Sequence, residues 1–220
     1  MRLAKYYYNM GYKRSDIERL LESFVLRCDS SIGMPKWNSL ISKCAANAGK
    51  HPMINVSGIS ITKKEMDAIG QLKGRLLQRL MFTLLCLAKY GNAVNPRNGN
   101  WVNRAAREIF MLANITVTTR RQSLMINDLW HAEYIGYSNI IDNINLNIKI
   151  VDNLEDNKHV FVTDFRNLGN QYMRLVGENY MQCQNCGLVV KRTSNRQKYC
   201  QACSVEMNIL ATSDRRSTAA

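Results

Sequence analysis

The amino-acid sequence predicts an α+β protein that is mainly helical and ends in a small four-cysteine zinc ribbon. Three observations predict this fold class. Apolar residues recur at helical spacing in several long stretches. Short β-branched runs stand beside pairs of turn-forming residues. Two C-x-x-C motifs, separated by 13 residues, lie near the C-terminal end. A chain of 220 residues that is 46% hydrophobic can also bury a core without depending on a metal for all of its stability.

Residues 1–74 are expected to form a helical N-terminal region with a small hairpin. Ser15 and Glu18 have the spacing of a capping box, so the first helix is expected to begin there. A second helix is expected to begin at Pro35, which fits a first turn, and to end at Gly49. The side chains expected to face inward are Ile17, Leu20, Leu21, Phe24 and Cys28, followed by Trp37, Leu40, Ile41 and Cys44.

The next stretch contains the hairpin and the start of a longer helical region. In residues 53–62, β-branched residues stand on both sides of a Ser-Gly pair, which predicts the hairpin. Thr62 and Glu65 form a second capping box. The helical region that follows is expected to break near Gly74 and to end at a left-handed stop at Gly91.

Residues 75–152 have the element order of a winged helix-turn-helix domain. A long apolar helix in 75–90 precedes a short extended piece at Trp101. Helix, tight turn and helix follow in residues 103–135, and two strand-like runs surround an Asp-Asn pair in residues 135–152. The order therefore predicts a winged helix-turn-helix-like core.

Three residues define the expected turn motif. Asn103 is placed to cap its first helix, and Thr118 is placed to cap its second. Asn114 lies where the chain has to turn, and Asn tolerates left-handed backbone better than most residues. The second helix is expected to bury Met125, Ile126 and Leu129.

After the wing, the chain is expected to pass through a connector into the ribbon. The connector, residues 153–180, contains a strand-like run in 158–164 and a short helix capped by Asp164 and stopped by Gly177. The ribbon is expected to occupy residues 181–211. Residues 212–220 are expected to form a disordered tail.

Four cysteines predict one structural Zn²⁺ ion. Cys183, Cys186, Cys200 and Cys203 form two C-x-x-C knuckles, and zinc prefers four tetrahedral ligands. Gly187 follows the first knuckle, where the backbone must fold back towards the metal. A lone C-x-x-C can be a redox motif, but two of them without a neighbouring βαβ pattern favour zinc. Four sulfurs leave no open position for a substrate.

The ribbon also carries positive charge. Its strands are expected at 188–192 and 196–200, and no acidic residue lies between Gln182 and Ala202. The basic residues of this hairpin are Lys191, Arg192, Arg196 and Lys198. These side chains either form a solvated surface or contact a phosphate backbone, and the lack of acids favours contact.

The ending C-x-x-C-G followed by SNRQKYC-x-x-C is similar to the zinc-ribbon tails of uncharacterised proteins from phages and mobile elements of Firmicutes. The resemblance covers about 25 residues of this chain. It implies an origin in a phage or mobile element, and it implies no particular activity.

Charge indicates a polyanionic partner. The chain has 30 Lys and Arg against 17 Asp and Glu, a net charge of +13. Residues 1–80 carry 14 basic and 6 acidic side chains, whereas residues 151–180 carry 3 and 5. Such a surplus favours nucleic acid as the partner. The alternative is a basic surface that binds nothing.

The sequence gives no sign of a secreted, membrane-bound or enzymatic protein. Tyrosines interrupt the N-terminal stretch, and the apolar run 80–88 is too short to span a membrane. No nucleotide-binding or catalytic motif occurs, and His51, His131 and His159 lie in separate segments. We therefore expect a non-enzymatic protein of the reducing cytoplasm of a bacterial host.

The leading hypothesis is a regulator that binds double-stranded DNA. In it, the helix at residues 119–131 enters the major groove. The residues expected at base edges are Thr119, Arg120, Ser123 and Asn127, with Arg121 at a base or a phosphate. The residues expected at phosphates are Arg104, Arg107 and Lys149, together with the basic residues of the ribbon.

An alternative hypothesis stays open. Winged helices also dock proteins, so the chain could instead bind and block a host nucleic-acid machine, such as a CRISPR effector or RNA polymerase. The sequence does not distinguish DNA, RNA and protein as the main ligand, and it does not indicate the oligomeric state.

Overall fold

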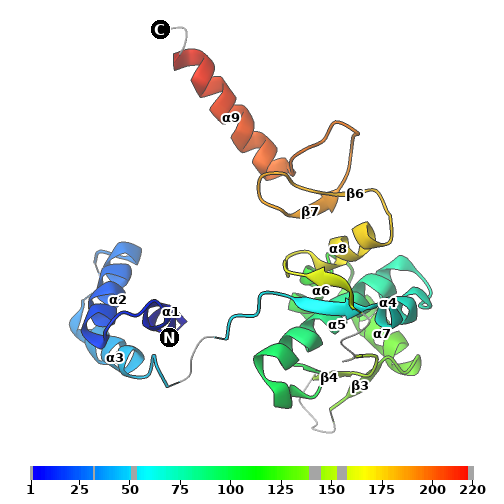
Figure 1. The fold of residues 1–220 in the computed structure, drawn as a ribbon, viewed down its shortest axis with the longest axis horizontal. Helices are drawn as coiled ribbons and strands as arrows, with labels where there is room; N and C mark the ends of the chain where they lie inside the picture. The colour runs from blue at the N-terminus through cyan, green and yellow to red at the C-terminus, as the bar shows by residue number, and fades with distance from the viewer. Residues whose placement is uncertain (1, 32, 51–53, 139–144, 153–157, 218–220) are drawn as a thin grey trace. The chain divides into compact units, whose positions relative to one another are not determined.

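The computed structural model describes residues 2–31, 33–50, 54–138, 145–152 and 158–217 (Figure 1). The chain divides into two compact units, Met1–Asn55 and Val56–Ala220. Helices dominate the described residues and three small antiparallel sheets accompany them, which confirms the mainly helical α+β class. Within the described part of the chain, no helix combines the length and apolar character needed to cross a membrane.

The first unit consists of three helices around a small core. The helices are α1 (Arg2–Asn9), α2 (Arg14–Cys28) and α3 (Pro35–Ala46). The buried residues are Ala4, Ile17, Leu21, Ile41, Ala45 and Ala48. Three of these are alanines, so this core is thin. Phe24, Cys28, Trp37 and Leu40 lie exposed, and the expectation that they face inward is therefore wrong.

The helix starts of this unit differ in part from the sequence prediction. Ser15 does not cap α2, because the helix begins one residue earlier and its N-cap, Lys13, makes no side-chain hydrogen bond. Glu18 instead accepts a hydrogen bond from Arg14 Nε at 3.1 Å. Pro35 opens α3 as predicted, whereas α3 ends at Ala46, before Gly49.

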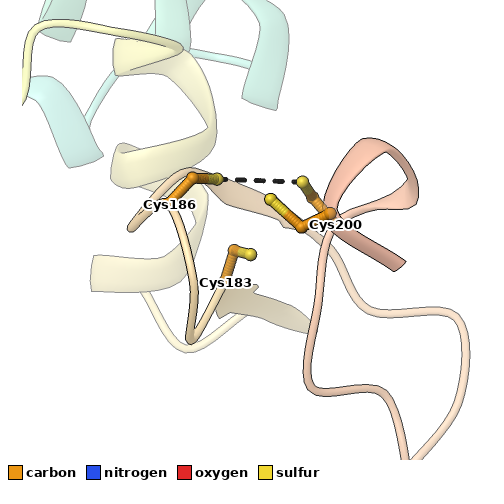
Figure 2. A group of neighbouring side chains, drawn as sticks. Cys183, Cys186 and Cys200 are labelled. Carbon is orange, nitrogen blue, oxygen red and sulfur yellow. Dashed lines mark hydrogen bonds between the residues drawn. The ribbon is translucent and has the colours of Figure 1, made fainter. Parts of the chain in front are cut away.

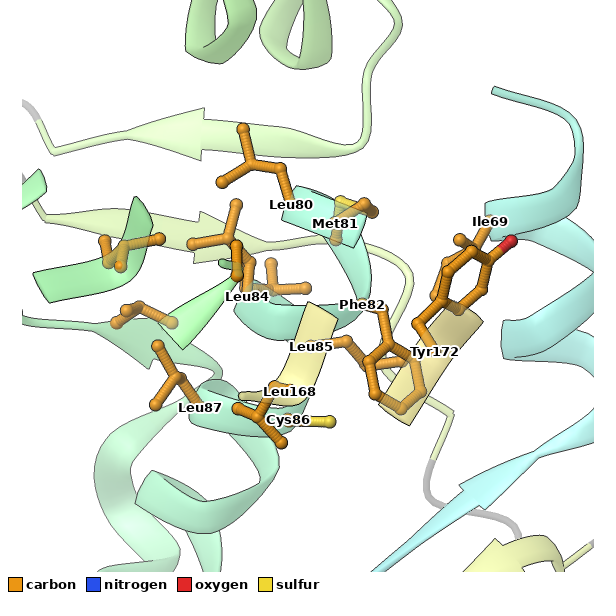
Figure 3. Close-up of a cluster of buried hydrophobic side chains, with 14 of the residues drawn as sticks. Ile69, Leu80, Met81, Phe82, Leu84, Leu85, Cys86, Leu87, Leu168 and Tyr172 are labelled. Carbon is orange, nitrogen blue, oxygen red and sulfur yellow. The ribbon is translucent and has the colours of Figure 1, made fainter. Parts of the chain in front are cut away.

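The second unit is built around α5 (Arg75–Val94), whose residues 80–88 are all buried (Figure 3). The predicted break at Gly74 is confirmed, since Gly74 has a φ of 92° and α5 begins immediately after it. The predicted stop at Gly91 is wrong, because the helix continues through this glycine to Val94. A short 3-10 helix, η1 (Pro96–Asn98), follows.

Strand β1 (Ile59–Thr62) pairs with a distant strand and forms no local hairpin. Its partner is β5 (Lys158–Val162), antiparallel, with Ile59 opposite Val162. Residues 54–56, in the first arm of the predicted hairpin, form no strand, and Met53 lies outside the described residues. The hairpin prediction is therefore wrong: β1 finds its partner about 100 residues further along the chain.

The capping box at the start of α4 (Lys63–Gly70) is confirmed. Thr62 Oγ1 accepts a hydrogen bond from Glu65 N at 3.2 Å, and Glu65 Oε2 accepts one from Thr62 N at 2.7 Å. The Glu65 carboxylate also accepts hydrogen bonds from Asp152 N and from Lys89 Nζ, each at 2.7 Å. Glu65 is fully buried and Lys89 is 10% exposed, so this ion pair joins α4 and α5 inside the protein.

Helix, turn and helix follow in the predicted place, as α6 (Ala106–Leu112) and α7 (Thr119–His131). Asn114 has a φ of 51°, which confirms its left-handed conformation in the turn. Thr118 Oγ1 accepts a hydrogen bond from Arg121 N at 3.3 Å, which confirms the cap of α7. Asn103 does not cap α6, because that helix begins after Ala105.

A three-stranded antiparallel sheet accompanies these helices. Its strands are β2 (Trp101–Val102), β3 (Ile135–Tyr137) and β4 (Leu146–Ile148), in the spatial order β2-β4-β3. Leu146, in β4, lies opposite Val102 on one side and opposite Tyr137 on the other. The predicted turn at Asp142 and Asn143 lies outside the described residues.

Helix α8 (Leu168–Leu175) packs against α5 and leads towards the C-terminal cysteines. Its N-cap is Asn167, in left-handed backbone, so Asp164 is not the cap that the sequence predicts. The chain leaves the helix through Gly177, with a φ of 82°, as expected. The remaining elements are β6 (Tyr180–Gln182), β7 (Val189–Lys191) and α9 (Gln201–Ser217). Helix α9 runs through residues 212–217, where the sequence predicts a disordered tail.

The buried ion pair generates a stability prediction. Lys89→Met leaves the Glu65 carboxylate buried without its cation, so we expect a loss of about 3–5 kcal/mol in the free energy of unfolding. The matched control is Arg104→Met, which removes an exposed i,i+4 pair with Glu108 and should cost about 0–1 kcal/mol. Urea unfolding followed by circular dichroism measures both variants. Equal losses would contradict a structural role for the buried pair.

Candidate metal centre and basic surface

The four C-terminal cysteines converge on one point (Figure 2). Cys183, Cys186, Cys200 and Cys203 place their sulfur atoms within 4.8 Å of one another. Cys186 Sγ and Cys200 Sγ are 3.8 Å apart. Zinc–sulfur bonds of about 2.3 Å at tetrahedral angles would put the sulfurs about 3.8 Å apart. The cluster therefore has the dimensions of a four-thiolate metal site.

The cluster is reduced and largely shielded from solvent. No disulfide joins any cysteine of the chain. Cys183, Cys200 and Cys203 are buried, and Cys186 is half-buried. Within the described residues, this is the one group of three or more His, Cys, Asp or Glu side chains that could hold a metal ion.

Backbone hydrogen bonds shape the knuckles that present the sulfurs. Gly187 N donates to Cys183 O at 3.0 Å, and Gly187 has a φ of 75°, which other residues rarely adopt. Cys183 N donates to Leu188 O at 2.9 Å. Gln184 N donates to Lys198 O at 3.0 Å, which ties the first knuckle to the segment before the second. The glycine after the first knuckle thus has the role that the sequence predicts.

The strands of this region differ from the prediction. The run 188–192 does contain β7, but 196–200 forms no strand. The partner of β7 is β6, which precedes the first knuckle, with Met181 opposite Val190. The second knuckle instead opens α9. The prediction of a hairpin between the two knuckles is therefore wrong.

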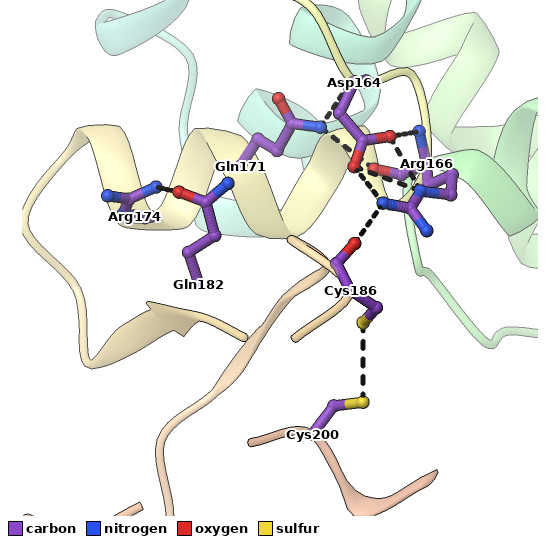
Figure 4. Close-up of polar contacts among 7 residues, drawn as sticks. All are labelled: Asp164, Arg166, Gln171, Arg174, Gln182, Cys186 and Cys200. Atoms are coloured by element: carbon purple, nitrogen blue, oxygen red, sulfur yellow. Dashed lines mark hydrogen bonds and ion pairs between the residues drawn. The ribbon is translucent and has the colours of Figure 1, made fainter. Parts of the chain in front are cut away.

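Side chains from the preceding segment hold the first knuckle against the second unit's core (Figure 4). Arg166 Nη2 donates to Cys186 O at 2.8 Å and to Asp164 Oδ2 at 2.8 Å. Burial raises the pKa of Asp164, but hydrogen bonds from Arg166 lower it by more, so the net shift is downward. Arg174 Nη1 also donates to Gln182 Oε1 at 3.0 Å.

Without a metal ion, the thiols of the cluster differ in pKa. Burial raises the pKa of Cys183, but backbone N–H groups of the knuckles outweigh it and lower this pKa to about 6. A hydrogen bond from the Asn185 side chain lowers the pKa of Cys203, but hydrogen bonding with the Cys200, Cys186 and Cys183 sulfurs together with burial outweighs it and raises this pKa to about 12. A metal ion has to displace the remaining protons, so its affinity is expected to fall as the pH falls.

Helix α7 presents the second candidate site on its solvent side. Met125, Ile126 and Leu129 are buried, as predicted, and they fix which face points outward. The residues predicted to contact nucleic acid on this helix are all exposed: Thr119, Arg120, Arg121, Ser123 and Asn127. Arg120 and Asn127 are two turns apart on one face, with Leu124 between them.

The sequence reasoning missed three apolar members of this surface. Leu124 is 45% exposed, Trp130 43% and Tyr137 of β3 42%. The Trp130 ring lies 6.0 Å from that of Tyr137 and 4.7 Å from that of His131. Their helical positions relative to the buried Met125 could have identified the first two, but the proximity of Tyr137 depends on how β3 folds back.

The other predicted contact residues are scattered around these two sites. Arg104 forms an ion pair with Glu108, so its charge is partly neutralised. The remaining residues are exposed on α6, on the segment after β4, and around the cysteine cluster: Arg107, Lys149, Lys191, Arg192, Arg196 and Lys198. The two histidines that the structure describes lie apart, since the His131 ring meets Trp130 edge-on in α7 and His159 is exposed on β5, while His51 lies outside the described residues.

No protein-family model matches this chain, and comparisons with curated proteins and with solved structures found no significant match. The relation to phage and mobile-element proteins therefore stays a prediction from the ending of the sequence.

The cysteine cluster generates a metal prediction. The purified protein should hold one metal ion per chain, and Cys183→Ser or Cys200→Ser should release it and loosen residues 178–210. The helical part of the second unit should stay folded, because its core is separate from the cysteines. Cys28→Ser, at an exposed and isolated thiol, is the control. Elemental analysis and circular dichroism measure these effects. A metal content far below one equivalent, without disulfides, would contradict the assignment.

Proposed function

We propose that this chain binds double-stranded DNA through a winged helix-turn-helix domain and that its cysteine cluster holds a structural Zn²⁺ ion. The observation that carries the proposal is the outward face of α7. Its apolar side is buried, while Arg120, Ser123 and Asn127 stand exposed in a row. A helix in the major groove reads bases with such side chains, since Arg fits guanine and Asn fits adenine.

The surrounding elements support this role. Helix α5, strand β2, helices α6 and α7, and strands β3 and β4 follow one another, and the sheet order is β2-β4-β3. This connectivity supports the proposal of a winged helix. Lys149, exposed on the segment after β4, is suited to contact a phosphate beside the reading helix. Arg107, exposed on α6, is suited to the same task.

The choice of zinc follows from the ligands. Four thiolates in a tetrahedral arrangement favour zinc in a structural role, because the ligand shell is closed. The exposed Lys191, Arg192, Arg196 and Lys198 add a basic surface beside this site. Long, flexible cations suit phosphates better than base edges, so this surface would contribute affinity and little sequence preference.

A second candidate function rests on the exposed apolar side chains. Leu124, Trp130 and Tyr137 give the α7 surface an apolar edge of the kind found at the centre of protein interfaces. In that case the chain would bind and block a host nucleic-acid machine. For DNA, Leu124 would instead contact a thymine methyl group.

Binding to naked duplex DNA distinguishes the two functions. We expect the zinc-loaded protein to bind fragments of the DNA that encodes it, with an affinity that falls steeply as salt rises. The measurement is a gel shift over a range of salt, beside a pull-down from host extract. Weak binding to every duplex, together with capture of one host complex, would contradict the DNA proposal.

Substitutions on α7 test base reading. Arg120→Ala and Asn127→Ala should each cost about 1–3 kcal/mol on the preferred site and much less on unrelated duplexes. The matched control is Lys64→Ala, at an exposed lysine of α4, which should change the affinity neither for the preferred site nor for unrelated duplexes. Fluorescence anisotropy on both duplexes measures the difference. Equal losses of binding free energy on all sequences would mean that these residues contact only the phosphate backbone. No loss on either duplex would mean that this face of α7 does not bind DNA.

The salt dependence of DNA affinity tests whether the basic residues around the cysteine cluster contact phosphates. Each phosphate neutralised adds about 0.9 to the slope of log affinity against log salt for duplex DNA. Changing Lys191, Arg192, Arg196 and Lys198 together to Gln should flatten that slope by roughly 2–4 units and leave the preferred sequence unchanged. Zinc content is checked in both proteins. With zinc retained, an unchanged slope would leave the cysteine region a purely structural role.

A further inference from the structure

One buried side chain joins the turn before α7 to the cysteine region. Asn170, in α8, is 3% exposed. Its Nδ2 donates to Val189 O at 3.0 Å, and its Oδ1 accepts from Asn114 Nδ2 at 2.9 Å. Val189 begins β7, three residues after Cys186, and Asn114 is the left-handed residue between α6 and α7. Two consecutive hydrogen bonds thus connect the two candidate sites.

The turn is seated directly on α8. A Cβ atom at Gly169 would lie 1.9 Å from Ala113 O, so only glycine allows this approach. Arg79 Nη2 donates to Ala113 O at 2.9 Å and also to Asn114 O. The backbone of the turn is therefore held from two sides, and the Asn114 side chain is held by Asn170. A displacement of Asn170 would therefore change the hydrogen bonding of this turn.

The ribbon end of the link depends on the cysteines. The core of this region consists of the buried Cys183, Cys200 and Cys203, with Cys186, Val190 and Tyr199 packed against them. So small a core is held together mainly by what joins the four sulfurs. Strand β7 follows the first knuckle, and β6 leads into it. The metal ion therefore adds to the β6–β7 pairing, in which Val189 lies opposite Gln182, in holding Val189 O beneath Asn170.

We infer that Asn170 is a positioning residue that transmits metal occupancy to the turn before α7. With the metal bound, Val189 O orients the Asn170 amide so that its oxygen faces Asn114. When the metal leaves, the Asn170 amide loses its acceptor, and a buried unsatisfied donor is costly. The amide then reorients, and Asn114 loses the partner that offsets its left-handed conformation. As far as it concerns DNA, the inference rests on the proposed function.

Coupling of this kind is reciprocal. If metal binding strengthens DNA binding by some factor, DNA must strengthen metal binding by the same factor. A second contact offers a comparison, because Arg166 also joins the core to the first knuckle through Cys186 O. The Arg166 side chain is 57% exposed and does not contact the turn through any hydrogen bond described for it. Loss of the Arg166 side chain should loosen the cysteine region but leave the Asn170 hydrogen bonds to Val189 and Asn114 in place.

Hydrogen exchange tests the link without requiring DNA. The reporter is the amide of Ile115, which donates to Phe110 O at 2.9 Å in the turn. In the full-length wild type, removing the metal with a chelator should speed exchange in residues 113–118 about fivefold or more, the effect of one lost hydrogen bond. Amides in the centre of α5 should not change.

The test variant is Asn114→Gly, because glycine keeps the left-handed turn and removes only the side-chain link. Its turn should exchange fast with metal bound, and chelation should change the rate less than about twofold. Asn170→Leu, of similar volume, should show the same fast exchange and the same small effect of chelation. In Arg166→Gln, chelation should speed exchange of the turn as much as it does in the wild type. The inference is overturned if chelation has no effect on the wild-type turn, if it has the same effect in Asn114→Gly, or if α5 exchanges faster as well.

DNA binding supplies an independent arm. Chelation should weaken binding to the preferred duplex more in the wild type than in Asn114→Gly. A chain that binds no duplex would contradict the proposed function, while the exchange experiment would still decide whether Asn170 transmits metal occupancy.

Discussion

The second unit depends on one constraint: the central part of α5, residues 80–88, must be covered on every side. Residues 80–88 are buried without exception, including Cys86 and Thr83. A helix that is hydrophobic all round cannot face water. Strand β1 and α4 cover part of it, α6, α7 and strands β2 and β4 cover another part, and α8 packs along it as well. Each of these elements takes its orientation from α5.

That arrangement determines which surfaces remain for function. Because α7 gives Met125, Ile126 and Leu129 to the core, its polar residues are left on the outside. Leu168 and Tyr172 of α8 pack in the core beside α5 (Figure 3). Asn170 of the same helix therefore reaches both the turn before α7 and β7. The hydroxyl of Tyr172 also reaches the buried Gln78 on α5 at 3.1 Å. Asn170 thus links the cysteine region to the turn before α7 through hydrogen bonds at both ends of its amide.

Local signals in the sequence predicted more of this structure than distant pairings. The capping box at Thr62, the left-handed Asn114 and the cysteine spacing each depend on a few neighbouring residues, and the structure confirms them. The pairing of β1 with β5 and of β6 with β7 depends on what the rest of the fold places nearby, and the sequence assigned both strands wrong partners. Tyr137 was missed for a related reason, since its proximity to Trp130 depends on how β3 folds back.

The central claim is that the outward face of α7 meets duplex DNA while the zinc-bound region contacts the backbone beside it. Photo-crosslinking of the zinc-loaded protein to a duplex selected from a random-sequence pool, with the crosslinked peptides identified by mass spectrometry, tests it most directly. The account predicts crosslinks within residues 119–131 and within residues 188–198. Crosslinks confined to residues 1–55, or no selected duplex at all, would contradict it.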